Sequence, residues 1–520
     1  MNRKINRGLM ILSAQLRTAS RTALCVILCA ALFASCNRDA KNTAAAPARD
    51  TLVIAVASDP ATFDLLYANT LIEGQIGNNI YDGLLFFDED GTIGPWLAER
   101  YELSADGLDY TFFLRKGVKF HNGEEFTARD VAFTIAYAQG TPNGTVVTSM
   151  IKSVSIIDDY TIKITLNEPV SSFLSEFAGD QLAIYNEKAV TSVEKYGAVP
   201  IGTGAYRFVS REPGAEVRLE AFDGYYGPKP PIKIVIFRVI PDEFTAAVAL
   251  ETGDIDFIWI AGAATAATLR DKPNITIYSG PSNRVNYITM NVERPPFNNV
   301  KLRQAVNYAI NRETIREIAY EGESQNKDYM AMPWMAGFAE PDRRYAYDPT
   351  LAAALAADAG VSKDKPVAVS LITTGANRRV GEVVQQNLAA IGINLTIDLM
   401  EFNTWVTKYY AGDFQIAAGG HYIMFKDMNY LTEFYHSANI NQGNSARYRN
   451  AGVDRLLAAG RREPDGEKRR AIFKQVVDIV QEDAPYAVIA NPAIIRAYHK
   501  DINIAHSYPN GIYAKDISWK

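Results

Sequence analysis

The three cysteines of this 520-residue chain, Cys25, Cys29 and Cys36, all lie within its first 36 residues. The long remainder can therefore form no internal disulfide and no thiolate metal site. Such a chain must be stabilised by burying apolar side chains, and 48% of its residues are hydrophobic, an ordinary share for a globular protein. Because the length exceeds what one core usually holds, we expect two or three domains of about 150 residues each.

The first 35 residues have the layout of an export signal. Five basic and no acidic residues precede the apolar stretch 23–33, and the small residues Ala34 and Ser35 follow it. A membrane-spanning helix needs about 20 apolar residues, so this stretch is too short to be a permanent anchor. We expect residues 1–35 to be removed as a signal peptide.

The run LFASC, which ends at Cys36, resembles a bacterial lipobox. In such a box the cysteine thiol receives a diacylglyceryl group, the chain is cut before the cysteine, and the new amine is acylated. The resemblance implies that Cys36 is the first residue of a lipid-anchored protein, since several acyl chains hold a protein stably at a membrane. The alternative is an ordinary signal peptide cut near Ser35, which releases a soluble protein with one free thiol. Both layouts are compatible with a start at Met1 or at Met10.

Charge composition restricts the partners. Without residues 1–35 the chain loses five of its 53 basic residues and none of its 59 acidic ones, which leaves a formal net charge of −11. This charge disfavours a nucleic-acid partner. Residues 36–50 are mostly small and polar without apolar periodicity, and we interpret them as a tether. No later stretch is apolar enough to span a bilayer.

After the tether, short β-branched runs alternate with helical patterns. One helix begins at Asp242 and ends at Gly253, a second covers 380–391, and a long one covers 466–482 and ends before Pro485. Strands separated by helices are typical of an α/β fold whose sheets are covered by helices. We expect the strands at 51–56, 231–240, 255–258, 367–372, 395–399 and 487–495.

Residues 101–164 have a different pattern, in which short strands are separated by turn signals such as Asn122-Gly123. Thr127 precedes an apolar periodic run, and Asp130 follows three residues later. We therefore expect Thr127 to cap a helix with Asp130 in its first turn. The segment is predicted to form a small α+β unit.

A family resemblance begins at Tyr81, where the chain reads YDGLLFFDEDGTIGPWLAERYELSADGLDYTFFLRKGVKFHNGEEFTARDVAFTI. This stretch resembles the signature region of the extracellular solute-binding proteins of ABC importers, peptide and nickel group. Further matches follow in order: PIGTGAYRF from Pro200, NYITMNVERPPFNNVKLRQAVNYAINRETI from Asn286, YDPTLAAALAADAG from Tyr347 and IGINLTI from Ile391. The resemblance covers nearly all of the chain after Cys36.

The resemblance implies an α/β fold of the two-lobed periplasmic-binding-protein type, in the large type II peptide-binding subclass with an extra α+β subdomain in lobe I. A ligand that contacts both lobes shifts an open–closed equilibrium about hinge strands, which we place near 278–286 and near Asn491. An ABC permease complex then recognises the closed form. The expected division is 51–84, 200–283 and 491–520 for lobe I, 85–199 for the inserted subdomain and 284–490 for lobe II.

The resemblance also implies where the protein acts. We expect a monomer outside the cytoplasm, attached to the membrane through the lipid on Cys36, at the periplasmic face or the cell surface. Its partners would be a peptide or other small-molecule ligand and the permease complex.

The family pattern places two stretches of lobe I in the cleft. Glu73, Gly74 and Gln75 would line it, although an ordinary helix start explains them equally well. Trp259, which follows the strand GDIDF, would stack on the ligand, and the alternative is that it belongs to the core. From lobe II, Phe402 and Tyr409 would face the cleft, with packing of their helix as the alternative.

A further lobe II stretch, GGHYIMF, departs from the family pattern. Peptide-binding members have an aspartate there that pairs with the peptide α-amine, and a count without gaps from Asn429 places that position at Ile423. An ammonium buried without a partner is costly. A zwitterionic peptide should therefore bind poorly in this mode, unless Asp427 or Glu73 substitutes in a shifted register. The expected pocket residues of this stretch are Gly420, His421, Tyr422 and Ile423.

An apolar and aromatic pocket with one imidazole favours an N-blocked peptide, a sugar-derived compound or another small organic solute. Nickel-chelate binding is a less favoured alternative, because the chain has only five histidines and no pair at metal-ligand spacing. We expect no metal site and no cofactor.

Two other classes of function remain. An enzyme is not expected, because the sequence has no nucleophile elbow, HExxH helix or phosphate-binding loop. A lipoprotein of the same fold could act instead as a sensor or an adhesin. Permease and ATPase genes beside this one would favour import over sensing.

Overall fold

The computed structural model describes residues 49–68, 70–89, 92–178, 182–423, 426–464, 466–506 and 513–520. The expected signal peptide, Cys36 and nearly all of the tether lie outside the described residues. The chain divides after Arg49, and the architecture described here is that of Asp50–Lys520. Within the part that the structure describes, no helix is long and apolar enough to cross a membrane.

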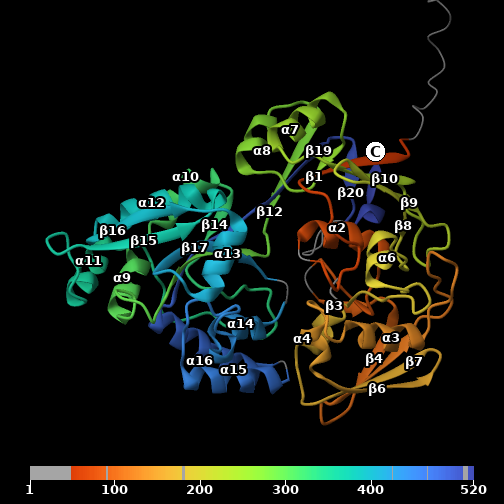
Figure 1. Ribbon diagram of the computed structural model, residues 1–520, viewed down its shortest axis with the longest axis horizontal. Helices are drawn as coiled ribbons and strands as arrows, with labels where there is room; N and C mark the ends of the chain where they lie inside the picture. Colours follow the sequence, from red (N-terminus) through yellow and green to blue (C-terminus); the bar gives the residue numbers. More distant parts are fainter. Residues whose placement is uncertain are drawn as a thin grey trace, which may run out of the picture. The chain divides into compact units, whose positions relative to one another are not determined.

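Lobe I is built on a seven-stranded sheet in the order β12-β19-β11-β1-β10-β9-β8 (Figure 1). Its centre is parallel, since β1 (Thr51–Val56) pairs in parallel with both β10 (Ile234–Val239) and β11 (Phe257–Ile258). The predicted strands 51–56, 231–240 and 255–258 are thus neighbours in one sheet. The outer strands are β8 (Tyr206–Glu212), β9 (Glu216–Ala221), β12 (Ile275–Gly280) and β19 (Ile494–His499).

The crossover from β10 to β11 is helix α7 (Glu243–Thr252), and its predicted limits are confirmed. The Asp242 carboxylate accepts a hydrogen bond from the Thr245 N–H at 2.7 Å, and Gly253 ends the helix in the left-handed conformation with φ 82°. Helix α8 (Ala263–Leu269) follows, and both helices pack on the same face of the sheet. The opposite face is covered by helix α2 (Leu71–Ile80).

The inserted subdomain has a four-stranded antiparallel sheet in the order β4-β5-β7-β6 and its own hydrophobic core. Its main helix, α3 (Ala128–Ala138), has the predicted capping box formed by Thr127 and Asp130. The strands are β4 (Ala98–Leu103), β5 (Asp109–Leu114), β6 (Ile151–Asp158) and β7 (Thr161–Leu166). The smaller elements of lobe I are β2 (Leu85–Phe87), β3 (Ile93–Pro95), α4 (Thr145–Thr148), α5 (Phe173–Glu176), α6 (Val193–Ala198), β20 (Ile502–Ile504), η5 (Ala514–Asp516) and β21 (Ile517–Trp519).

Lobe II is built on a six-stranded sheet in the order β14-β18-β13-β17-β15-β16. Its predicted strand-helix-strand unit is present, since β15 (Val367–Thr373) and β16 (Ile393–Leu399) pair in parallel and α12 (Arg378–Ala389) connects them. The other strands are β13 (Arg284–Met290), β14 (Ser324–Asn326), β17 (Ile416–Tyr422) and β18 (Tyr486–Pro492).

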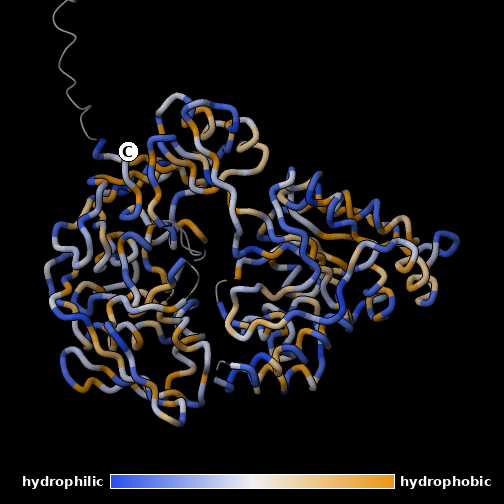
Figure 2. Tube along the Cα trace, turned by 180° about the vertical axis from the view of Figure 1, so that it is seen from behind, coloured by the Kyte–Doolittle hydropathy of each residue, from blue (hydrophilic) through white to orange (hydrophobic). Residues whose placement is uncertain are grey.

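The two faces of this sheet carry separate cores. On one face lie α9 (Val300–Ala309), α10 (Arg312–Tyr320), α11 (Pro349–Asp358) and α12. On the other lie α13 (Phe402–Ala411), α14 (Leu431–Tyr435), α15 (Ala451–Arg462) and α16 (Glu467–Asp483), with the short turns η2 (Gly375–Asn377), η3 (Met428–Tyr430) and η4 (Ser437–Asn439). Hydrophobic and hydrophilic residues alternate along α15 and α16 in Figure 2, as expected for helices with one buried face.

The chain crosses between the lobes at two points (Figure 1). Strand β12 belongs to the sheet of lobe I and β13 to that of lobe II, with residues 281–283 between them. The second crossing corrects a prediction, because 487–495 is not one strand: β18 ends at Pro492 and β19 begins at Ile494, in different sheets. A continuous apolar run does not reveal this break, because both strands are buried.

Candidate functional site

Strand β17 divides the predicted stretch Gly420–Ile423 between two sides, because side chains alternate along a strand. Gly420 and Tyr422 face the α10 side, where a Cβ on Gly420 would lie 1.9 Å from Asn286 Oδ1 and the Arg284 guanidinium covers the Tyr422 ring at 4.8 Å. His421 faces the α14 side. Its ring lies 5.9 Å from that of Tyr430 and 5.3 Å from that of Phe434.

His421 lies beside the carboxyl group of Glu433, a residue that the sequence did not identify as part of the site. Its Nε2 lies 3.6 Å from Oε1 of Glu433, which α14 brings over the end of β17. This distance is too long for a hydrogen bond. Among the described residues neither side chain has a hydrogen-bond partner, although they are only 29% and 32% exposed. The pair therefore has unused hydrogen-bonding capacity on a partly open surface.

Burial shifts both titrations toward the uncharged form. Loss of solvation, aided by the charge of Arg284, lowers the pKa of His421 to about 4. Loss of solvation raises the pKa of Glu433 to about 7. At neutral pH the imidazole is therefore uncharged, and the Glu433 carboxyl group titrates near neutral pH instead of being fully ionised. The pair can donate and accept hydrogen bonds with little fixed charge.

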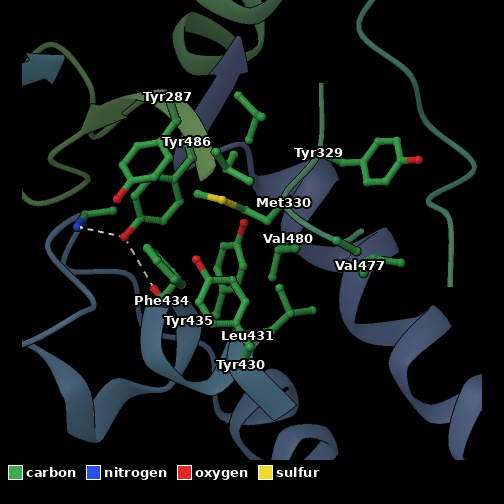
Figure 3. Packing of buried hydrophobic residues seen from close by; sticks show 14 of the residues in the cluster. Tyr287, Tyr329, Met330, Tyr430, Leu431, Phe434, Tyr435, Val477, Val480 and Tyr486 are labelled. Atoms are coloured by element: carbon green, nitrogen blue, oxygen red, sulfur yellow. Dashed lines mark hydrogen bonds between the residues drawn. The ribbon is translucent and has the colours of Figure 1, made fainter. Parts of the chain in front are cut away.

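The His421 ring contacts aromatic residues of the core on this face of the sheet, and two aromatic residues of that core have polar atoms without partners. The hydroxyl of Tyr430 and the indole Nε1 of Trp405 are buried, and neither has a hydrogen-bond partner in the described part of the chain. Figure 3 shows Tyr430 and Phe434 among the aromatic residues of this core. Because buried polar groups are nearly always satisfied in folded proteins, unsatisfied ones beside an open pair indicate a surface that a ligand completes.

The other two lobe II candidates occupy different environments. Phe402, at the start of α13, is 62% exposed and its ring lies 6.4 Å from that of Trp405. Tyr409 is buried between Trp405 and Phe414, and its hydroxyl lies 2.9 Å from Thr289 Oγ1. Phe402 is therefore available at the surface, whereas Tyr409 supports Trp405 from beneath.

The lobe I candidates are mostly engaged in the structure of their own lobe. The Glu73 carboxylate completes the capping box of α2 with Thr70 and accepts a hydrogen bond from the Ala61 N–H at 3.1 Å. Trp259 is buried in the core, where its ring lies 5.8 Å from that of Phe257.

The remaining two lobe I candidates follow Glu73 on α2. Gly74 is half-buried. Gln75 is buried, and its Oε1 has no partner among the described residues. Contact of any of these residues with a ligand stays a prediction.

The substitute carboxylates considered for Ile423 are also engaged. Asp427 pairs with the fully buried Arg469 at 2.5 Å and accepts a hydrogen bond from the Asn429 N–H at 2.7 Å. Ile423 itself is 2% exposed, and its backbone N–H donates to the Asn283 carbonyl at 2.7 Å. Neither Asp427 nor Glu73 thus offers a free carboxylate at this position.

The inserted subdomain contacts lobe II at the end of α15. The backbone N–H and the hydroxyl of Ser171 each donate to the Arg461 carbonyl at 3.0 Å. Beside them Nη2 of Arg462 lies 2.6 Å from Oε2 of Glu168. These interactions tie the lobes together at a place distinct from the two crossings.

No group of three potential metal ligands occurs among the described residues.

Comparisons with known proteins agree with this architecture. A family model described as "Bacterial extracellular solute-binding proteins, family 5 Middle" matches residues 92–442. Heme-binding protein A of Haemophilus influenzae is 30% identical, over 93% of this chain and 94% of that protein. The glutathione-binding protein GsiB of Pectobacterium atrosepticum is 29% identical, over 89% of this chain and 92% of that protein.

Among solved structures, the periplasmic binding protein DppA of Helicobacter pylori in complex with the peptide STSA superposes with a TM-score of 0.78 at 27% identity. That match covers 90% of this chain and 98% of DppA. The substrate-binding protein CtaP of Listeria monocytogenes gives a TM-score of 0.83 at 25% identity, over 91% of this chain and 99% of CtaP. These neighbours share the two-lobed fold.

Proposed function

Because this chain belongs to family 5 of the bacterial extracellular solute-binding proteins, we propose that it captures a peptide-like or other small organic solute between its lobes and delivers it to an ABC permease. As a member of that family it is a solute-binding protein of an ABC importer for peptides or related ligands. The names of its relatives mention haem, glutathione and dipeptides, so membership alone leaves the solute open.

The observation that carries the proposal is the unsatisfied pair His421 and Glu433. At neutral pH this pair has little fixed charge, and aromatic rings surround it. Apolar walls with a few polar groups are typical of small-molecule sites. Such a surface suits hydroxyl, amide and aromatic groups, as found in a sugar-derived compound or an N-blocked peptide.

A count without gaps from Asn429 puts the position that holds a peptide amine in the family's peptide-binding members at Ile423, whose apolar side chain is buried. An ammonium placed there would lose its hydration and gain no carboxylate partner, which costs several kcal/mol. We therefore expect simple zwitterionic peptides to bind weakly. Hinge closure about 281–283 and Ala493 then brings lobe I residues such as Gln75 onto the solute.

We also propose that Cys36 carries the lipid that holds the protein at the extracytoplasmic face of a membrane. The support is the order of charges, apolar residues and small residues that ends in LFASC. The chain between Cys36 and the first strand at Thr51 could extend at most about 50 Å, which lets the folded part stay near a membrane permease.

Calorimetric titration at pH 7 tests the ligand class. We expect Ala-Ala to bind the wild type weakly, and N-acetyl-Ala-Ala to bind at least as well because it has no ammonium to bury. Nanomolar binding of Ala-Ala by the wild type would contradict the proposal.

A further inference from the structure

A pocket of about 220 Å³ lies at the contact between the inserted subdomain and lobe II. Glu168 lines it from the inserted subdomain, and the rest of its lining comes from α14, α15 and the residues between them, including His436, Arg461 and Arg462. A liquid water molecule occupies about 30 Å³, so the pocket has room for a small organic acid or a phosphate group.

Arg461 is the cation of this pocket that lacks a partner. Its guanidinium has no hydrogen-bond acceptor and no carboxylate at ion-pair distance among the described residues, and its Nε is buried. A guanidinium remains protonated at any physiological pH and offers up to five N–H donors. Because buried donors are nearly always satisfied, this arrangement points to an acceptor that binds from outside the chain.

The other charges of the pocket nearly cancel. Nε and Nη2 of Arg462 lie 2.8 and 2.6 Å from Oε2 of Glu168, so these two residues neutralise each other. Arg461 therefore leaves the pocket with an excess positive charge. The pocket therefore favours an anion over a neutral or positively charged ligand.

His436 adds a second donor. Its Nδ1 accepts a hydrogen bond from the Ala438 N–H at 3.1 Å, and the Asp454 carboxylate is farther away, at 3.9 Å. Because Nδ1 accepts this bond, the N–H donor of the ring is Nε2, and His436 is one of the residues that line the pocket. The Asp454 carboxylate accepts hydrogen bonds from the N–H and the hydroxyl of Ser437, so it does not compete with a ligand for the His436 imidazole.

We propose that this interlobe pocket binds an oxyanion, either a carboxylate or a phosphate group, through Arg461 and His436. The proposal goes beyond the capture of solute at His421 and Glu433 and does not depend on it. The anion is a free ion or an acidic group of the solute itself, since Glu433 and the pocket residue His436 lie on and just after the same short helix, α14.

The place of the pocket links the anion to lobe closure. Glu168 completes one wall only when the inserted subdomain contacts lobe II, where Ser171 also holds the Arg461 carbonyl. A ligand that binds one arrangement of the lobes better than another shifts the equilibrium toward it. An anion in the pocket therefore favours the arrangement in which the inserted subdomain contacts lobe II, and by linkage raises the affinity for a solute that favours the same arrangement.

The test uses the full chain, dialysed free of small anions, and compares the wild type with Arg461→Gln and Arg455→Gln. Arg455 is an exposed residue of the same helix outside the pocket, so its variant is the matched control. Neither substitution alters the Arg461 carbonyl that Ser171 holds. Calorimetric titrations with inorganic phosphate and with acetate are then repeated with the solute that co-purifies with the protein.

If the pocket takes a free anion, phosphate or acetate binds to the wild type and to Arg455→Gln, and Arg461→Gln binds it about 10- to 100-fold more weakly. If the anion belongs to the solute, neither ion binds, but Arg461→Gln loses affinity for the co-purified solute by a similar factor. The proposal is overturned if neither ion binds and all three proteins bind the solute equally. The phosphate and acetate titrations remain informative even if His421 and Glu433 have no part in solute binding.

Discussion

Nε2 of His421 lies 3.6 Å from Oε1 of Glu433, and no other hydrogen-bonding group satisfies either side chain in the described part of the chain. His421 lies near the end of strand β17, and Glu433 lies on the short helix α14. The His421 ring packs against Tyr430 and Phe434, and no hydrogen bond joins it to Glu433. Such an arrangement is stable only as a surface that water or a solute completes.

Removing either member of the pair should weaken solute binding. We expect His421→Ala and Glu433→Ala each to lower the affinity for the co-purified solute about 10- to 100-fold, the usual range for losing a hydrogen bond of a buried site. Calorimetric titration measures the change. Glu382→Gln, an exposed carboxylate that pairs with Arg378 on α12, is the control and should bind as the wild type does.

The stability of the protein should depend on pH through Glu433. Burial raises the pKa of Glu433 to about 7, above its ordinary value of 4.5, so the folded state binds more protons than the unfolded state between these values. The stabilisation is fully present below pH 4.5 and is lost as the pH rises through 7. Glu433→Gln does not titrate, so its melting temperature relative to the wild type should increase from pH 5 to pH 8.

The neighbouring groups do not reverse this trend. His421, with its pKa lowered to about 4, is present in both proteins, so its titration contributes equally to both, and Tyr410 and Tyr430 have pKa values raised above 10. A difference in melting temperature that is constant across this pH range would show that Glu433 is solvated in the folded state.

Asp427 should prove structural. Its carboxylate pairs with Arg469, which is fully buried, and breaking such a pair typically costs about 3–5 kcal/mol. We expect Asp427→Ala to lower the free energy of unfolding in urea by that amount. The folded fraction should bind solute with unchanged affinity, whereas a large loss of affinity at unchanged stability would assign Asp427 to the site.

The contact between the inserted subdomain and α15 should stabilise the closed form. Ser171→Ala removes one of two hydrogen bonds to the Arg461 carbonyl, and Glu168→Gln removes the ion pair with Arg462. Together these interactions are worth about 1–2 kcal/mol, so the double variant should release solute about 5- to 30-fold faster in stopped-flow measurements. An unchanged dissociation rate would mean that the contact persists in the open form or contributes nothing to closure.

Cys36→Ser should release the protein from the membrane. Without the thiol no diacylglyceryl group can be attached. Cleavage of the signal peptide then yields a soluble protein. Fractionation of cells that produce the wild type and the variant measures the change. If the wild type and the variant are distributed between the membrane and soluble fractions in the same way, the ordinary signal peptide is favoured.

Much of the fold could be predicted from sequence because its signals are local. Thr127 and Asp130 form the expected capping box, and Asp242 and Gly253 limit α7 as expected. The alternation of strands and helices likewise gave the α/β class. The break between β18 and β19 was missed, because it depends on which sheet each half of a buried apolar run joins.

The site was less accessible to sequence reasoning. His421 was found through the family pattern, but its partner Glu433 was not, because their proximity arises when α14 packs over β17. A carboxylate within a run of aromatic residues, LTEFY, was the available signal. The alternation of side chains along β17, which separates Tyr422 from His421, could have been applied once the strand was recognised.

We propose that His421 and Glu433 hold the solute. Native mass spectra of the wild type and of the His421→Ala, Glu433→Ala double variant, purified identically, test it most directly. We expect a co-purified small molecule that stays on the wild type, leaves when the protein is unfolded, and is absent from the folded variant. The same retained mass on both proteins would contradict it.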